Sequence, residues 1–169
     1  MSNGILTNPS EEVSESLKKP IAKILFDNMV HSFHKEAFSN IKLSSKLHLF
    51  QNIKTEIGIS KYLIEVKDFR FRRAMSKLGL SNHSLNIEKG RHKSLEKNER
   101  LCFLCRTKVE SEIHFMIRCQ SYVDLRDKYL AFELVENLSN DWDRCLIILS
   151  NNNNNSTAKF IYEALKSRD

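Results

Sequence analysis

The chain has 169 residues, of which 41% are hydrophobic and 28% charged, and it holds only four glycines and two prolines. This length fits about one domain with a sizeable core, and the composition excludes collagen-like, fully disordered and disulfide-scaffold proteins. No apolar run approaches the roughly 18 to 20 residues that span a bilayer, and residues 1–10 lack the charged start and apolar centre of a secretory signal. We therefore expect an intracellular protein of the nucleus or cytoplasm, with no membrane partner.

The net charge of +6 is concentrated in one part of the chain. Between Lys67 and Lys108 there are twelve lysines or arginines against four acidic residues, a local charge of +8. Such a segment is typical of a surface that meets phosphates. The alternative is a solvated positive face with no partner.

Helical periodicity dominates the first half of the chain. The polar residues 1–19 predict a flexible or partly helical lead-in. Pro20 suits the first turn of a helix, and apolar residues then recur every four positions over about five turns, which predicts a stripe buried against the rest of the domain. The stripe consists of Ile21, Leu25, Met29, Phe33 and Ala37.

Two further helices are expected before residue 80. The first spans residues 43–57 and stops at Gly58, and the second runs from Ser60 to Leu78, with Gly79 as a left-handed C-terminal cap. One face of this second helix is apolar, and the opposite face carries Lys67, Arg70, Arg73 and Lys77. Residues 81–100 lack a period, so they are expected to form mostly loop.

The second half predicts one well-defined helix and a looser tail. Glu110, Ser111 and Glu112 start a helix that continues to about Leu134, where the acidic side chains complement its dipole. The five asparagines at 151–155 predict a linker, and a final helix follows through Phe160 and Leu165. The fold class is mainly α, divided into a lead-in (1–19), a helical region (20–100), a zinc module (101–135), and a linker with a C-terminal helix (136–169).

Four residues follow the pattern C-x2-C-x8-H-x4-C, namely Cys102, Cys105, His114 and Cys119. Zinc prefers thiolate and imidazole ligands in a tetrahedron, and a short turn or hairpin delivers the first two cysteines to one ion. Three thiolates and one imidazole fill all four positions, which predicts one structural Zn²⁺ and no metal-activated water. Such a site contributes on the order of 10 kcal/mol to folding.

Several alternatives stand beside the zinc site. The four residues could be unrelated, or Cys102 and Cys105 could form a redox pair, although redox C-x-x-C motifs normally follow a strand in a βαβ unit. Cys145 fits a small core residue. His31 and His34 fit ordinary helix-surface residues better than metal ligands. His83 and Glu88 fit residues that anchor their own loop better than catalytic residues.

The stretch from Ser45 to about Leu130 resembles the region beyond the reverse transcriptase domain in polyproteins of non-long-terminal-repeat retrotransposons. Their pattern is C-x(1 to 3)-C-x(7 to 8)-H-x4-C, and the resemblance covers about half of the chain. It is carried, besides the four metal-ligand candidates, by 45–47, 50–58, Tyr62, Leu63, Arg73, Ala74, 81–91, Arg100, Glu110, Glu112, Phe115, Tyr122, Leu125 and Arg126. The resemblance implies a zinc-binding tail that handles nucleic acid, with the two cysteines, the histidine and the third cysteine as ligands.

Catalytic motifs of such polyproteins are missing from this sequence. It has no Tyr-x-Asp-Asp or Phe-x-Asp-Asp, the paired aspartates that hold a polymerase's two metal ions, and no nuclease-like Pro-Asp and acidic-x-Lys element. It also lacks the His-x-Glu and the open metal position of a zinc deaminase. We expect a non-catalytic, truncated or domesticated fragment with no small-molecule substrate.

The predicted function is therefore binding of RNA or DNA phosphates through a basic surface. Phe103 could stack on a base or pack beneath the metal turn. The alternative function is a zinc-stapled scaffold that packs against a protein, such as the reverse transcriptase domain of a parent polyprotein. The candidate phosphate-binding residues are Lys67, Arg70, Arg73, Lys77, Arg91, Lys93, Arg100, Arg106 and Arg118.

Overall fold

The computed structural model describes residues 9–54, 58–130, 135–150 and 154–168, and it is mainly helical as predicted. The chain divides into two compact units, residues 1–43 and 44–169. Among the described residues, extended segments pair only at one antiparallel bridge, between Leu101 and Val109. None of the helices in the described residues combines the length and the hydropathy of a membrane-spanning segment.

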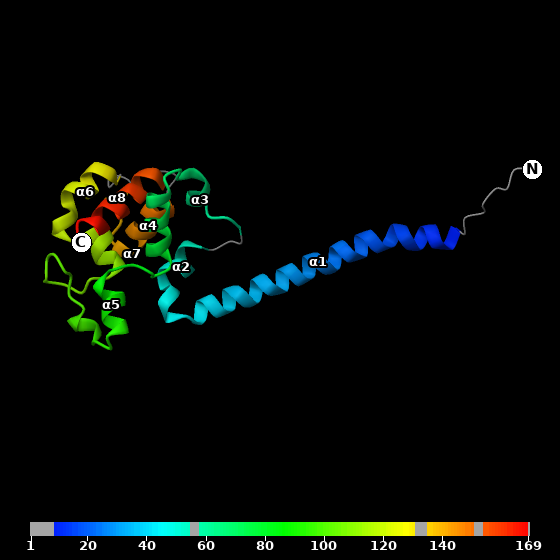
Figure 1. The fold of residues 1–169 in the computed structure, drawn as a ribbon, viewed down its shortest axis with the longest axis horizontal. Helices are drawn as coiled ribbons and strands as arrows, with labels where there is room; N and C mark the ends of the chain where they lie inside the picture. The colour runs from blue at the N-terminus through cyan, green and yellow to red at the C-terminus, as the bar shows by residue number, and fades with distance from the viewer. Residues whose placement is uncertain (1–8, 55–57, 131–134, 151–153, 169) are drawn as a thin grey trace, which may run out of the picture. The chain divides into compact units, whose positions relative to one another are not determined.

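The first unit is the helix α1, Pro9–Leu43 (Figure 1). The expected start at Pro20 is wrong, because Pro20 lies inside the helix. Proline removes one backbone hydrogen bond, but the Glu-, Leu- and Lys-containing residues before it favour helix and extend it backwards. Within this unit Ile21, Leu25 and Phe33 are more than half exposed, and their burial against the rest of the domain stays a prediction.

The second unit begins with the short turn η1 (Ser45–Leu47) and the helix α2 (His48–Ile53). The predicted helix 60–78 is two helices, α3 (Lys61–Glu65) and α4 (Phe69–Gly79). The break is set by Asp68, whose carboxylate accepts a 2.8 Å hydrogen bond from the backbone N–H of Arg70 and so caps α4. Lys67 consequently lies before α4 and not on its cationic face.

Two local predictions after α4 are wrong. The left-handed position is Ser81, with φ of 51°, and not Gly79, which is the last residue of α4. Residues 81–100 are not mostly loop, because they hold the helix α5 (Asn86–His92) and the turn η2 (Lys97–Glu99). A carboxylate distant in sequence supports α5: Glu110 accepts a 2.7 Å hydrogen bond from the N–H of Asn86, an otherwise unpaired first-turn donor.

The expected continuous helix from residue 110 to 134 is also broken. A π-helical turn, η3 (His114–Arg118), is followed by the 3₁₀ turn η4 (Gln120–Tyr122) and the helix α6 (Val123–Tyr129). The chain then forms α7 (Asp141–Ser150) and α8 (Asn154–Lys166). The last two residues of the predicted asparagine linker therefore belong to α8, and its first three lie outside the described residues. The predicted C-terminal helix is confirmed.

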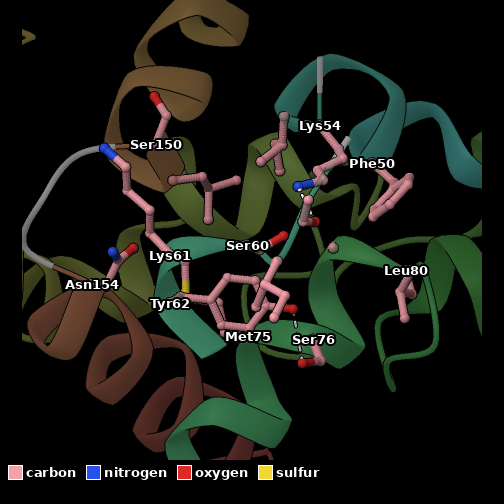
Figure 2. Close-up of a pocket in the computed structure, with 15 residues that line it drawn as sticks. Phe50, Lys54, Ser60, Lys61, Tyr62, Met75, Ser76, Leu80, Ser150 and Asn154 are labelled. Carbon is pink, nitrogen blue, oxygen red and sulfur yellow. Dashed lines mark hydrogen bonds between the residues drawn. The ribbon is translucent and has the colours of Figure 1, made fainter. Parts of the chain in front are cut away.

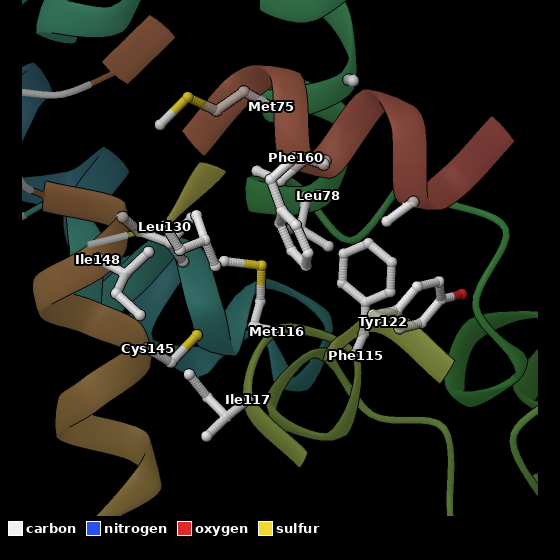
Figure 3. Packing of buried hydrophobic residues seen from close by; sticks show 14 of the residues in the cluster. Met75, Leu78, Phe115, Met116, Ile117, Tyr122, Leu130, Cys145, Ile148 and Phe160 are labelled. Carbon is white, nitrogen blue, oxygen red and sulfur yellow. The ribbon is translucent and has the colours of Figure 1, made fainter. Parts of the chain in front are cut away.

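The core of the second unit lies where α4, α7 and α8 meet the turn η3. Figure 3 shows Met116 between Cys145 of α7 and Phe160 of α8, and all three side chains are buried. Phe115 packs on Tyr122 and on Phe160, with ring centroids 5.1 and 5.7 Å apart. The turn that carries His114 is therefore anchored directly in the core. Cys145 is a core residue as predicted, and burial raises its pKa to about 12.

Candidate metal centre and cationic groove

A small hairpin presents the first two cysteines. The N–H of Cys102 donates to the carbonyl of Lys108 at 2.8 Å, and the N–H of Arg106 donates to the carbonyl of Cys102 at 3.0 Å. Arg106 adopts a left-handed φ of 56°, which closes the turn. The predicted short turn or hairpin is confirmed, and it directs Cys102 and Cys105 to the same side.

The π-helical turn η3 presents the other two candidate ligands. The N–H of Cys119 donates to the carbonyl of His114 at 2.8 Å, an i to i+5 bond that brings these two residues together. Ser111 fixes the start of this segment, because its hydroxyl accepts a 3.1 Å bond from the N–H of His114. A π turn with four residues between its ends thus explains the x4 spacing, and π turns are frequent at functional sites.

The four side chains converge on one point. All four candidate ligand atoms lie within 4.8 Å of one another. A tetrahedral zinc with bonds of about 2.3 Å to sulfur holds two thiolates about 3.8 Å apart, and the sulfurs of Cys102 and Cys119 are 3.8 Å apart. The Sγ of Cys105 lies 3.3 Å from Nε2 of His114. The cluster is a buried site that can hold one metal ion, and its donor set fits zinc.

Electrostatic effects differ between the ligands. Burial raises the pKa of Cys102 to about 12. At Cys105 burial also opposes ionisation, but hydrogen bonds from the hydroxyl and backbone of Thr107 outweigh it and lower the pKa to about 7. Burial lowers the pKa of His114, which favours the neutral imidazole that binds metal.

One carboxylate ties the cluster to the end of the chain. Glu110 is completely buried, and its Oε1 accepts a 3.5 Å hydrogen bond from the Sγ of Cys102. Its Oε2 pairs with the guanidinium of Arg168 at 2.6 Å, and this guanidinium also donates to the carbonyl of Ser84 at 2.8 Å. The expectation that Glu110 serves the dipole of a helix is therefore wrong, because it is an internal ion-pair partner.

One edge of the cluster faces a surface hollow of about 480 Å³. Cys105 and His114 line this hollow together with Lys108 and Arg118, so an ion or a chelator has a path to the site. Phe103 is 54% exposed, so packing beneath the metal turn, one of its two expected roles, is not observed.

A second concave surface gathers three of the predicted phosphate-binding residues. Arg70, Arg73 and Lys77 of α4 line a groove of about 640 Å³ between α4, α8 and residues 82–89. Lys89 and Lys166 line the same groove, which we call the cationic groove. Its other described lining residues are Phe69, Ala74, Asn82, His83, Ser84, Tyr162 and Leu165, and none of these is an aspartate or glutamate.

The other six predicted cations lie outside this groove. Arg100 is folded onto Gly90 and donates to the carbonyls of Leu95 and Ile87 at 2.7 and 3.0 Å. Arg91 pairs with Glu88, and Arg118 pairs with Asp141. The remaining three, each exposed and without an ion pair among the described residues, are Lys67, Lys93 and Arg106.

A third hollow, of about 300 Å³, lies between α2, α3, α4 and α7 (Figure 2). Its walls are largely apolar, with Phe50, Tyr62 and Met75 among them. The polar groups that Figure 2 joins with dashed lines are bonded to each other: the hydroxyl of Tyr62 to that of Ser76 at 2.9 Å, and the ammonium of Lys54 to the carbonyl of Gly58 at 2.6 Å. These groups are therefore occupied within the wall.

Sequence reasoning missed several residues of both sites. Glu110 and Ser111 lie between the metal ligands, and their position inside the motif was the available signal. Arg126 is one of the residues that carry the retrotransposon resemblance, but sequence reasoning assigned it no structural role; it is buried and donates to the carbonyl of Cys119 at 2.6 Å. Lys166 and Tyr162 reach the groove from α8, far along the sequence from α4, so only the tertiary fold reveals them.

Comparisons with known proteins identify no family for this chain. No protein-family model, no curated protein and no solved structure matches it.

Proposed function

We propose that the chain is a non-catalytic, zinc-stabilised module that binds RNA or DNA through the cationic groove. The observation that carries the proposal is the meeting of Arg70, Arg73 and Lys77 with Lys89 and Lys166 around one concave surface, with no carboxylate among the described residues that line it. Lysine and arginine side chains grouped in this way neutralise phosphates and release counterions.

Zinc has a structural part in this proposal. Three thiolates and one imidazole fill a tetrahedral shell, so the ion has no open position at which to activate water. The metal centre and the groove are neighbours in the fold. Glu110, which lies between the candidate metal ligands in the sequence, bonds to Asn86 and Arg168. These two residues are each two positions from a residue that lines the groove, Ser84 and Lys166. The CCHC spacing further supports an origin in a retrotransposon-type polyprotein.

The proposal is tested by salt-dependent binding of labelled RNA and DNA to the whole chain. We expect binding that weakens steeply with salt. Reversing the charges of Arg70, Arg73 and Lys77 to glutamate should lower affinity at least tenfold. The salt slope should fall by about 0.7 for each phosphate of a single strand that the variant no longer neutralises.

A matched control reverses three exposed lysines outside the groove, Lys42, Lys97 and Lys128, which changes the net charge equally. If the control weakens binding as much as the groove variant, the effect comes from net charge and the groove has no part in it. If no oligonucleotide binds at low salt, the proposal is wrong.

A second candidate function is favoured by α1. This helix exposes Ile21, Leu25 and Phe33, and a protein partner would remove such apolar surface from water. In this alternative, zinc staples a scaffold that packs against a protein such as a reverse transcriptase domain. Absence of nucleic-acid binding, together with retention of zinc, would favour it.

A further inference from the structure

The cationic groove combines charge with aromatic and amide groups, which indicates more than phosphate binding. Arg70 forms an ion pair with Asp68. The other four cations of the groove have no ion-pair partner among the described residues; they are Arg73, Lys77, Lys89 and Lys166. Four of its five cations are therefore available to an anionic ligand.

Two aromatic rings flank these cations. Phe69, the first residue of α4, is 63% exposed on the groove wall. Tyr162 of α8 is held in place by Phe71, with ring centroids 5.2 Å apart, and by the guanidinium of Arg70, which lies 5.8 Å from the tyrosine ring. Exposed or rigid aromatic rings next to cations are the pattern of surfaces on which unpaired bases stack.

The floor of the groove also offers polar groups. The side chain of His83 is buried, and its Nε2 faces a carboxylate oxygen of Glu112 at 3.1 Å. Its Nδ1 has no hydrogen-bond partner among the described residues. Asn82 lies beside it, exposed, in the lining. A buried polar atom without a partner costs free energy, but this Nδ1 is shielded from solvent, so the exposed Asn82 is the polar group that this part of the groove offers to a ligand.

The shape of the groove favours a single strand over a duplex. Proteins that recognise double-stranded DNA insert a projecting helix or β-ribbon into its major groove, which is about 12 Å wide. Here α4 packs along α8 (Figure 1), and its cations form one wall of a recess of about 640 Å³. A recess of this size admits an unpaired nucleotide, but the paired bases of a duplex cannot turn toward Phe69 or Tyr162.

We propose that the cationic groove binds single-stranded RNA or DNA, with phosphates on Arg73, Lys77, Lys89 and Lys166 and a base stacked on Phe69. This inference rests on the proposed function and specifies its ligand.

The first experiment compares a twelve-nucleotide oligo(U) or oligo(dT) with a twelve-base-pair duplex, using the whole zinc-loaded chain. The single strand should bind at least tenfold more tightly. Phe69→Ala should weaken single-strand binding about tenfold, the order expected for loss of one stacked base. Phe69→Tyr should restore it, because the stacking face returns.

Phe69→Ala is suited to this test because the side chain is exposed, so zinc content and thermal unfolding should stay those of the wild type. As an independent readout, Phe69→Trp should keep its affinity and lose fluorescence when oligo(U) or oligo(dT) binds, beyond the change that Trp142 shows in the wild type. Polyglutamate of equal charge should compete poorly.

The possible outcomes separate the two proposals. If the duplex binds as tightly as the single strand, or Phe69→Ala has no effect while the α4 charge reversals abolish binding, this inference is wrong and the proposed function stands. If polyglutamate competes equally, the groove is an acidic-peptide site. If no nucleic acid binds at low salt, both proposals are wrong.

Discussion

Glu110 joins three separate parts of the second unit through one carboxylate. It contacts the Sγ of Cys102, the N–H of Asn86 and the guanidinium of Arg168, and both Glu110 and Arg168 are almost fully buried. A buried ion pair contributes little net stability compared with apolar residues, but removing one partner leaves an unpaired buried charge. The arrangement therefore holds the end of α8 against the metal hairpin and tolerates little change.

Glu110→Ala should lower the free energy of unfolding by about 3 kcal/mol, because Arg168 would remain buried without its partner. Urea unfolding followed by circular dichroism measures this loss. Glu136→Ala, at an exposed glutamate, is the matched control and should change stability by less than about 0.5 kcal/mol. Equal effects of the two substitutions would contradict a special role for the pair.

At the scale of elements, the metal centre depends on the break in what the sequence predicts as one helix. The residue pattern Phe115, Tyr122, Leu125 and Tyr129 is helical in period, and these residues are buried or half-buried. The π turn and the 3₁₀ turn that interrupt the helix place Phe115, Met116 and Tyr122 in the core of the second unit, and periodicity does not contain such tertiary contacts. The four ligands were predictable because their chemistry is local, within eighteen residues.

The other helix boundaries were predictable only where a local sequence signal marks them. The break between α3 and α4 has a local signal in Asp68, an N-cap residue type. The helix α5 has none, because its first N–H is satisfied by Glu110, distant in sequence. In the cationic groove, the α4 residues were predictable from the helical charge pattern, whereas Lys89 and Lys166 were not.

The rate at which each cysteine is alkylated distinguishes the metal ligands from the core cysteine of α7. In the zinc-loaded protein, Cys102, Cys105 and Cys119 should resist alkylation because their sulfurs are bound to the ion. A chelator should release one zinc per chain and expose these three thiols, while Cys145 reacts only after denaturation, since it is buried in α7 with a pKa of about 12.

Mass spectrometry of the alkylated protein, with metal analysis in parallel, gives the order of reaction. Cys102→Ser or His114→Ala should abolish stoichiometric zinc and leave the other thiols reactive without chelator. Cys145→Ala, which lies outside the cluster, should keep one zinc. Zinc retained in the ligand variants would show that the four side chains do not share an ion.

At the scale of the whole molecule, the two units differ in how they bury apolar surface. The second unit has a core of its own, whose described residues run from Leu49 to Ala164, whereas the first unit is the single helix α1. Sequence periodicity identified α1 as a helix and Ile21, Leu25 and Phe33 as part of its apolar stripe. Amphipathic character specifies a face that can be buried, and only the tertiary structure shows what covers it.

Removing residues 1–43 should therefore leave residues 44–169 folded. We expect one zinc per chain and a thermal midpoint within about 3 °C of the intact chain, because the loss of a few tenths of a kcal/mol shifts the midpoint by this order. Calorimetry and metal analysis measure both. A midpoint lowered by 10 °C or more would show that α1 stabilises the second unit.

The sequence separations between contacting residues around Glu110 indicate the order in which parts of the second unit fold. The metal ligands pair across 17 and 9 residues, whereas Glu110 and Arg168 pair across 58. Short loops close at a smaller entropic cost than long ones. During synthesis the four candidate ligands can therefore meet once Cys119 has left the ribosome, whereas the ion pair of Glu110 forms only after an arginine about fifty residues later has been made.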